Sequence, residues 1–262
     1  MIDTLLSPVA LLGRAVIGGC RSTGRLALFL FEGLSHVVRP PFYVRLFADA
    51  FAEFAFFSMP MVALIGLFTG MVLALQSSTG LSRFNAESAI ADLVVLSMTR
   101  ELGPVLTAVM VAGRVGAAMA AQIGTMRVTD QIDALSTLST NPMKYLVAPR
   151  LLAGILALPI LVAVADILGV LGGYLIAVLK LGFDSHTYLK NTLDFMTTLD
   201  VVSGLVKGSV FGLLIALLGC YNGYRSRGGA EGVGAATTAS VVVASVLIFF
   251  FDYLLTEMFF SR

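Results

Sequence analysis

Four charged side chains lie in stretches of sequence that are otherwise apolar. Arg100 and Glu101 are adjacent in "MTRELGPVL" (98–106), and Lys207 and Asp252 each interrupt an apolar run farther along. Neighbouring residues on a helix point about 100° apart, so Arg100 and Glu101 cannot pair along one face. A charge in the bilayer core costs about 2.5 kcal/mol or more, so each should face a cavity or a partner on another helix.

Gly103 and Pro104 follow the charged pair and should disturb the helix there. Proline lacks an amide hydrogen and clashes with the carbonyl four residues back, which belongs to Arg100. Glycine loosens the same turn. We therefore expect a hinge at Gly103–Pro104, with a freed carbonyl beside the charges. Irregular backbone at membrane depth is tolerated where it lines a cavity or is buried in protein.

These buried charges have two interpretations. They could form a polar patch in an outward-opening cavity, suited to a substrate with a charged head and apolar tails. They could instead be ion pairs that hold helices together. Asp166, near the middle of another apolar run, is a further candidate partner in either case. The residues alone leave both interpretations open.

The composition indicates a membrane protein. Of the 262 residues, 58% are hydrophobic and only 13% are charged, whereas soluble domains have roughly 25% charged residues. The mean hydropathy is +0.93. A spanning helix needs about 20 mostly apolar residues. Five stretches meet that length: 54–82, 88–113, 151–179, 201–224 and 235–256. The net charge of +1 gives no indication of a nucleic-acid partner.

The first fifty residues have a different pattern. Arg14, Arg21 and Arg25 follow at spacings of seven and four within an apolar background, which places them on one helical face. This predicts an amphipathic helix in the membrane interface, and the alternative is a poor sixth span. We expect an interfacial segment over residues 1–50 and a five-helix transmembrane domain over residues 51–262.

Lysine and arginine in the loops predict the orientation, because cytoplasmic loops carry an excess of these residues. With the N-terminus in the cytoplasm and the C-terminus outside, four fall outside: Arg83, Lys180, Lys190 and Arg262. Eleven fall inside: Arg14, Arg21, Arg25, Arg39, Arg45, Arg114, Arg127, Lys144, Arg150, Arg225 and Arg227. Cys20 and Cys220 are then also cytoplasmic, so we expect free thiols.

The longest cytoplasmic loop contains a short amphipathic helix, predicted over residues 127–140. Its apolar residues recur at every third position: Ile132, Leu135 and Leu138. Its polar side is formed by three others: Asp130, Gln131 and Asp133. Asn141–Pro142 should end it, because the residue before proline avoids the helical region. Such a helix could lie on the membrane or dock into a groove on a partner, and its acidic residues favour docking.

Several kinds of chemistry are excluded by missing motifs. The chain has no G-x-x-x-x-G-K-[ST] phosphate loop, no H-E-x-x-H and no cysteine–histidine cluster. We therefore expect no enzyme activity, no metal and no cofactor on this chain. A transport subunit driven by a separate partner remains, as does a self-sufficient channel or carrier. A carrier would show an inverted repeat with paired broken helices, but only one broken helix is predicted.

One long stretch resembles a known family. "RELGPVLTAVMVAGRVGAAMAAQIGTMRVTDQIDAL" is similar to the signature region of the MlaE/YrbE family, the permease subunits of Mla-type (maintenance of lipid asymmetry) ABC transporters. The likeness continues in "GLFTGMVLALQ", "NPMKYLVAPR", "LGVLGGY", "KGSVFG" and "NGY". It covers roughly residues 55–262.

The resemblance implies an architecture and a set of partners. The fold would be an all-α integral membrane protein of exporter type, with an interfacial N-terminal helix, five transmembrane helices and a homodimeric assembly. A cytoplasmic ATPase would bind ATP and Mg and dock on the coupling helix. A STAS-domain protein and a periplasmic ring of MCE-domain subunits would complete a complex in the bacterial inner membrane. The matching coupling residues are Asp130, Gln131, Ile132, Asp133 and Leu135.

The resemblance also implies a phospholipid substrate, carried between inner and outer membranes, and a cavity at the dimer interface. The positions that match its lining are Leu73, Leu81, Phe84, Arg100, Glu101, Leu102, Lys207 and Asp252. Phe84 is tyrosine in the best-known relatives, and their arginines near the start of the fifth span are replaced here by "GVGAATTASV". None of these residues would be catalytic. A permease for another lipid, such as a sterol or mycolic-type molecule, is the alternative within this class.

Overall fold

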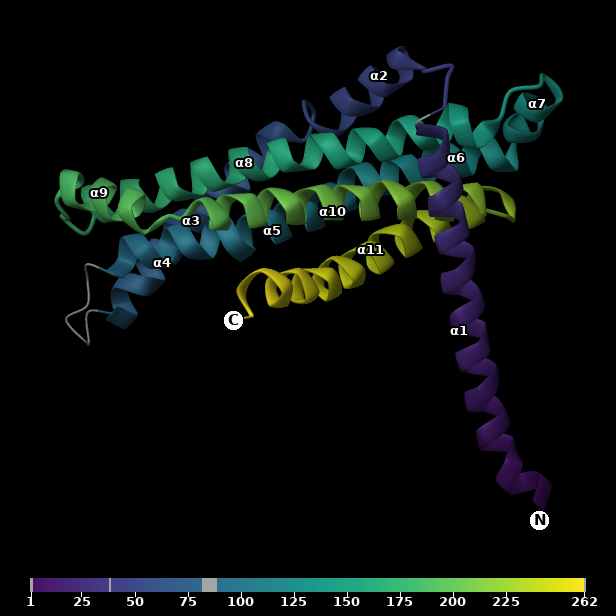
Figure 1. Cartoon of the computed structure of the whole chain (residues 1–262), viewed down its shortest axis with the longest axis horizontal. Coiled ribbons are helices and arrows are strands. Elements are labelled where there is room, and N and C mark those ends of the chain that lie inside the picture. The colour runs from purple at the N-terminus through teal and green to yellow at the C-terminus, as the bar shows by residue number, and fades with distance from the viewer. Residues whose placement is uncertain (1, 38, 82–88, 262) are drawn as a thin grey trace.

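The computed structural model describes residues 2–37, 39–81 and 89–261, and this part of the chain is helical without a strand (Figure 1). Five helical segments are long and apolar enough to cross a membrane: Val44–Leu81, Ile90–Val128, Met143–Leu179, Thr198–Tyr224 and Gly229–Phe260. The predicted all-α membrane protein with five spans is thus confirmed.

The first two spans are built from several shorter elements. The chain begins with α1 (Ile2–Val37), and the first span joins α2 (Val44–Phe54) to α3 (Met59–Leu81). The second span joins α4 (Ile90–Ser97), the π-helical turn η3 (Met98–Leu102), α5 (Gly103–Val111), the π-helical turn η4 (Ala112–Gly116) and α6 (Ala117–Val128). The remaining elements are α7 (Gln131–Thr137), the π-helical turn η5 (Met143–Val147), α8 (Ala148–Leu179), α9 (Ser185–Phe195), α10 (Thr198–Tyr224) and α11 (Gly229–Phe260).

Glycines bring the helix backbones into close contact. A Cβ atom built on Gly70 of α3 would lie 1.8 Å from the carbonyl oxygen of Gly169 in α8. A Cβ atom on Gly154 of α8 would lie 2.4 Å from the carbonyl oxygen of Gly212 in α10. Small residues at such crossings allow close helix packing in lipid.

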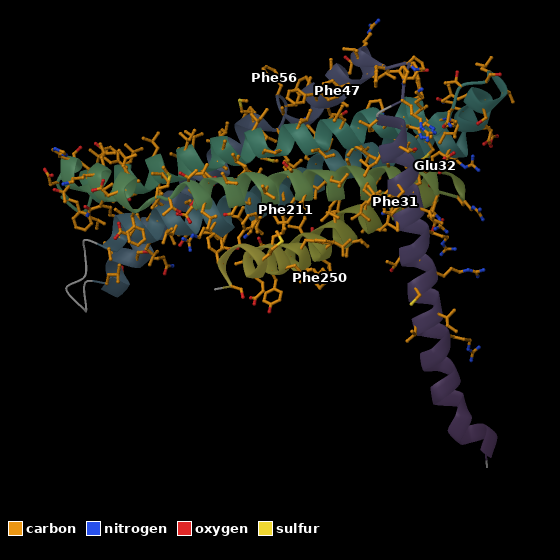
Figure 2. The ribbon with its side chains drawn as sticks, viewed as in Figure 1. Phe31, Glu32, Phe47, Phe56, Phe211 and Phe250 are labelled. Atoms are coloured by element: carbon orange, nitrogen blue, oxygen red, sulfur yellow. The ribbon has the colours of Figure 1, made fainter. Side chains whose placement is uncertain are left out.

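The core lies between the central helices α8 and α10. Leu158, Leu161 and Phe211 have no exposed surface there. The outer helices present large apolar side chains outward, among them Phe68 on α3 and Phe250 on α11. Figure 2 shows Phe211 among the helices and Phe250 on the open side of α11. Apolar surfaces of this kind suit contact with lipid tails or with another membrane-embedded chain.

The second span is longer than the predicted stretch 88–113, and Arg114 lies inside it rather than in a cytoplasmic loop. The guanidinium of Arg114 donates to the Oγ of Ser58 at 2.8 Å and to the carbonyl oxygen of Glu53 at 3.2 Å. Both acceptors lie at the break between α2 and α3. The arginine therefore satisfies polar groups that an interrupted helix leaves without partners.

Two loop predictions differ from the structure. The helix expected over 127–140 is α7, which covers only Gln131–Thr137, and Ser139 beyond it has a left-handed φ of 58°. Asn141 does not end this helix, because its Oδ1 accepts from the amide of Met143 at 2.9 Å and caps the next one. Residues 180–200, which separate the predicted stretches 151–179 and 201–224, contain a helix, α9.

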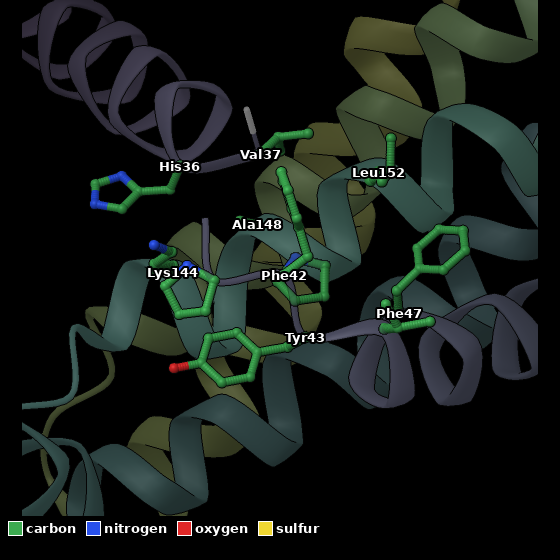
Figure 3. Close-up of a pocket in the computed structure, with 11 residues that line it drawn as sticks. His36, Val37, Phe42, Tyr43, Phe47, Lys144, Ala148 and Leu152 are labelled. Carbon is green, nitrogen blue, oxygen red and sulfur yellow. The ribbon is translucent and has the colours of Figure 1, made fainter. Parts of the chain in front are cut away.

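Helix α1 projects across one end of the bundle, so that its axis crosses those of the spans (Figure 1). Its last turn is held near the start of the third span. The Nδ2 of Asn141 lies 3.2 Å from the Nε2 of His36, and the Nζ of Lys144 donates to the carbonyl oxygen of Pro40. An apolar hollow of about 130 Å³ lies where the end of α1 meets the start of the third span. Figure 3 shows this hollow with Phe47 on one side.

Candidate functional site

Lys207 is the centre of a buried charge network. It lies on α10 with no exposed side-chain surface. Its Nζ donates to the carbonyl oxygen of Arg100 at 2.8 Å, to the Oε2 of Glu101 at 3.0 Å and to the Oγ1 of Thr256 at 2.7 Å. The Oδ1 of Asp252 lies 2.8 Å from the same nitrogen, as an ion pair without hydrogen-bond geometry. One ammonium group thus joins three helical segments, η3, α10 and α11.

Arg100 has a different set of partners from Glu101, as the helical geometry predicted. Its Nε and Nη2 atoms both lie 2.7 Å from the Oδ1 of Asp200, whose side chain is fully buried. Its guanidinium also lies over the ring of Phe260, 4.2 Å from the centroid. This geometry combines an ion pair with a cation–π contact.

The network includes residues that the sequence analysis missed: Asp200, Thr256 and Phe260. Asp200 carried a local signal, because it follows Thr197 by three residues at the start of an apolar run. That spacing forms a capping box in the structure, in which both side chains cap the start of α10. The carboxylate of Asp200 therefore caps a helix through one oxygen and binds Arg100 through the other. Thr256 and Phe260 carry no such local signal.

The backbone of the second span positions these groups. The irregularity predicted around Gly103–Pro104 takes the form of the π-helical turn η3, and the carbonyl of Arg100 turns to Lys207. Gly204 lies between the two charged residues of α10, and a Cβ atom there would come within 2.4 Å of the carbonyl oxygen of Thr99. Only glycine permits α10 to approach the wide turn so closely.

The network holds two cations and three carboxylates. Lys207 and Asp200 are fully buried, whereas the side chains of Arg100 and Glu101 are 33% and 39% exposed. The buried ion pairs hold helices together, and the exposed parts leave one positive and one negative group accessible. Across the described ranges, no His, Cys, Asp and Glu side chains form a group of three that could hold a metal ion.

The apolar residues predicted to line the cavity lie near each other. Leu73 and Leu102 line an open hollow of about 470 Å³ together with Thr69, Val72 and Gln76. Leu81 packs against the same apolar cluster as Leu73 and Leu102. Leu102 follows Glu101 directly in η3, so one end of the hollow is formed by the residue next in sequence to the charged pair. Phe84 lies outside the described residues.

Asp166 does not join the charge network. Its Oδ1 is buried, and it has no hydrogen-bond partner within the described ranges. This oxygen packs against Gly103, the position of the predicted hinge, since a Cβ atom on Gly103 would come within 1.8 Å of it. Glycine at position 103 is therefore required by a close contact as well as by the loosened turn.

The predicted coupling residues fall into two groups. Ile132 is fully buried in the main core, and Leu135 packs against that core as a partly buried residue. The polar residues are exposed: Asp130, Gln131 and Asp133. Asp133 binds Arg127 at 2.6 Å. Leu138, expected on the apolar face, is 75% exposed, so the surface that α7 offers to a partner is mostly polar.

The fold and the site define a multi-pass membrane protein whose spans are joined by a buried ionic network. The comparison with family profiles gives a more specific result: the profile described as "Permease MlaE" matches residues 47–258. The chain belongs to the MlaE permease family, as the resemblance implied. It is therefore a permease by family, and its charge network lies in the membrane-spanning part that the profile covers.

Three relatives illustrate the breadth of the similarity. A "Probable ABC transporter permease protein" of Rickettsia felis is 54% identical over 98% of this chain and 99% of its own. The "Intermembrane phospholipid transport system permease protein MlaE" of Haemophilus influenzae is 34% identical over 97% of both chains. "Protein TRIGALACTOSYLDIACYLGLYCEROL 1, chloroplastic" of Arabidopsis thaliana is 36% identical over 78% of this chain and 58% of its own.

Proposed function

We propose that this chain is the membrane subunit of an ATP-driven transporter that moves phospholipid between the inner and outer membranes and so maintains outer-membrane lipid asymmetry. The observation that carries the proposal is that η3 holds both the partly exposed charges of Arg100 and Glu101 and the apolar Leu102, which lines the hollow with Leu73. Polar groups beside an apolar hollow suit an amphiphile. The printed name of the Haemophilus relative supports phospholipid as the cargo.

The energy comes from a separate ATPase, which binds ATP and Mg, while this chain binds no cofactor. The ATPase docks on the exposed surface of α7, through Asp130, Gln131, Asp133 and the exposed Leu138. Ile132 supports this surface from inside the core. The assembly is a homodimer of this chain with a STAS-domain protein and a periplasmic ring of MCE-domain subunits. The names of the relatives as ABC transporter permeases support a complex with an ATPase.

The chain resides in the bacterial inner membrane with its N-terminus in the cytoplasm and its C-terminus in the periplasm. The excess of lysine and arginine in the segments assigned to the cytoplasmic side supports this orientation. Helix α1 lies in the cytoplasmic interface of the membrane. Its direction across the ends of the spans supports that placement (Figure 1).

In the transport cycle, the second span transmits the movement of the ATPase to the charge network. Closure of the ATPases moves α7, whose buried Ile132 transmits the displacement to the core. The second span responds at η3 and Gly103–Pro104, where the helical hydrogen bonding is already irregular. The displacement alters the access to Arg100 and Glu101, and lipid passes to or from the periplasmic ring.

The test is purification of the complex from native membranes, followed by mass spectrometry of the bound lipid. The chain is expressed with its genomic neighbours and carries the affinity tag. We expect an ATPase and stoichiometric phospholipid, with the lipid lost in Glu101→Ala. The matched control is Glu257→Ala, which removes an exposed carboxylate of α11 outside the network. A chain that purifies without ATPase or lipid, and moves a solute in liposomes without ATP, would contradict the proposal.

A further inference from the structure

A hollow of about 240 Å³ lies where the second span ends and α11 begins. Its lining comes from two places. Arg127 and Val128 end α6 and Asp130 follows it, while Ser226, Arg227 and Gly228 precede α11 and Gly229 begins it. None of these residues belongs to the charge network or to the apolar hollow beside it. Asp130 is shared with the surface around α7.

The main chain at this hollow has features that favour the binding of an anion. Helix α11 has 32 residues, and its N-cap residue Gly228 supplies no side-chain hydrogen bond. Gly228 and Gly229 have φ angles of 89° and 68°, values that residues with a side chain rarely adopt. Glycines also let another group approach the main chain closely. The free amides and the positive end of the helix dipole favour a negative group there.

Ser226 provides an independent indication of a ligand. The residue is only 5% exposed, and it lines the hollow. Its Oγ is buried, and within the described ranges it has no hydrogen-bond partner. A buried hydroxyl without a partner is unfavourable, and native structures contain few of them. A bound oxyanion in the hollow would accept the hydrogen bond that Ser226 has to donate.

The charges around the hollow favour a negative ligand. Arg227 is exposed, and its guanidinium makes no ion pair or hydrogen bond to the described residues. Arg127 also lines the hollow, although its Nη1 already binds Asp133 at 2.6 Å. Asp130 is the lining carboxylate and Asp133 neutralises Arg127, so Arg227 is the lining cation that is left without an ion pair among the described residues. Glu231 in the first turn of α11 does not line the hollow.

We propose that the hollow is a binding site for a phosphate group, either the headgroup phosphate of an anionic phospholipid or free phosphate. The guanidinium of Arg227 matches the geometry of phosphate oxygens, and the amides of α11 bind from the other side. Because Asp130 directly precedes α7, phosphate at this site would fix the position of α7 relative to α11. The site would therefore regulate the docking surface, and it does not depend on lipid being the transported cargo.

The first test is calorimetric titration of the full-length chain in detergent with inorganic phosphate. We expect saturable binding that Arg227→Gln weakens about tenfold or more, since a hydrogen bond to a charged group is lost. Ser226→Ala should weaken it several-fold, because the hydroxyl is lost without a change of fold. The matched control is Arg225→Gln, since Arg225 lies on the same connection but binds the hydroxyl of Tyr221 instead.

Two results would overturn the proposal. One is the absence of saturable phosphate binding to the unaltered chain. The other is an equal loss in Arg225→Gln and Arg227→Gln, which would indicate a diffuse effect of positive charge.

A second titration identifies the source of the phosphate. The chain is placed in nanodiscs of phosphatidylglycerol or of phosphatidylcholine and titrated with inorganic phosphate. Binding that is lost only in phosphatidylglycerol would support a lipid headgroup as the occupant. Equal binding in both kinds of disc would support free phosphate. Binding in detergent that is lost in both kinds of disc would support occupation by the headgroup phosphate that the two lipids share, and would contradict a preference for an anionic lipid.

Discussion

The Nζ of Lys207 lies 2.8 Å from the main-chain carbonyl oxygen of Arg100, the group that Pro104 deprives of its usual helical donor. A side chain on α10 thus replaces a backbone hydrogen bond of the second span. The same ammonium binds Glu101 and Asp252. The irregular turn and the buried charges are therefore parts of one arrangement, in which neither would be stable without the other.

Removal of the ammonium should destabilise the protein strongly. We expect Lys207→Met to lower the free energy of unfolding by about 3–5 kcal/mol, because it leaves buried carboxylates and a carbonyl without a partner. Thermal unfolding of the purified chain in detergent measures the change. The matched control is Lys190→Met, which alters an exposed lysine of α9. Equal stability of the two variants would show that the network contributes nothing to folding.

The crossing of α3 and α8 provides a second prediction. Gly70→Ala places a methyl group 1.8 Å from the carbonyl oxygen of Gly169, so the helices must separate. We expect a loss of about 1–3 kcal/mol in the free energy of unfolding. Gly80→Ala, in the same helix, meets nothing within 4 Å and should be neutral or slightly stabilising, since alanine favours helix. Denaturation of both variants in one detergent compares them, and a Gly70→Ala protein as stable as Gly80→Ala would refute the close crossing.

The two apolar residues of the α7 region should respond differently to substitution. Ile132→Ala creates a cavity in the core and should lower stability by about 2–5 kcal/mol. Leu138→Asp alters a side chain that is 75% exposed, so it should leave stability unchanged. If α7 docks on an ATPase, Leu138→Asp should reduce the amount of ATPase that purifies with the chain.

Two measurements separate these effects: thermal unfolding of the isolated chain, and the ratio of ATPase to permease after purification. Normal ATPase recovery in Leu138→Asp would exclude Leu138 from the docking surface. A stable Ile132→Ala protein would contradict the burial of that side chain.

The N-terminus of α9 should be sensitive to acid. The amide of Thr187 donates to the Oδ2 of Asp184 at 2.8 Å, and this hydrogen bond holds the pKa of Asp184 below its usual value of 3.8. A lowered pKa in the folded state means that the stabilisation is present above 3.8 and is lost as the pH falls through the lower, folded value. Amide hydrogen exchange at Thr187 should accelerate in that range relative to Asp184→Asn, whose cap does not titrate. An identical pH dependence in both proteins would contradict the cap.

Local physical signals account for the parts of the fold that the sequence predicted. Long, mostly apolar runs defined all five spans, because in lipid a spanning helix satisfies its own backbone. The angle of about 100° between adjacent residues on a helix predicted that Arg100 and Glu101 have different partners. Proline chemistry identified the freed carbonyl. Each of these arguments depends on residues within about one helical turn.

The missed features depend on contacts between distant segments. Thr256 and Phe260 resemble ordinary residues of an apolar helix until α11 lies beside η3. In the sequence, Arg114 appeared to mark a cytoplasmic loop. Its acceptors, the carbonyl oxygen of Glu53 and the hydroxyl of Ser58, come from the first span, so no local pattern revealed them. Ile132 appeared free to dock, because the sequence does not show that the core covers it.

The π-helical turns η3 and η4 have a consequence for the rotational phase of the second span. A π turn accommodates one more residue than an α turn, and one residue corresponds to about 100° of rotation. The faces of the helix before Met98 and after Gly116 are therefore out of phase. Deletion of one residue within 98–102 would convert the π turn to an α turn and leave the two halves of the span in the same relative orientation, whereas deletion of one residue from α5 would rotate the half that leads to α7 by about 100°. A difference of one residue within 98–102 should therefore be interpreted as the loss of a π turn rather than as a change of loop length.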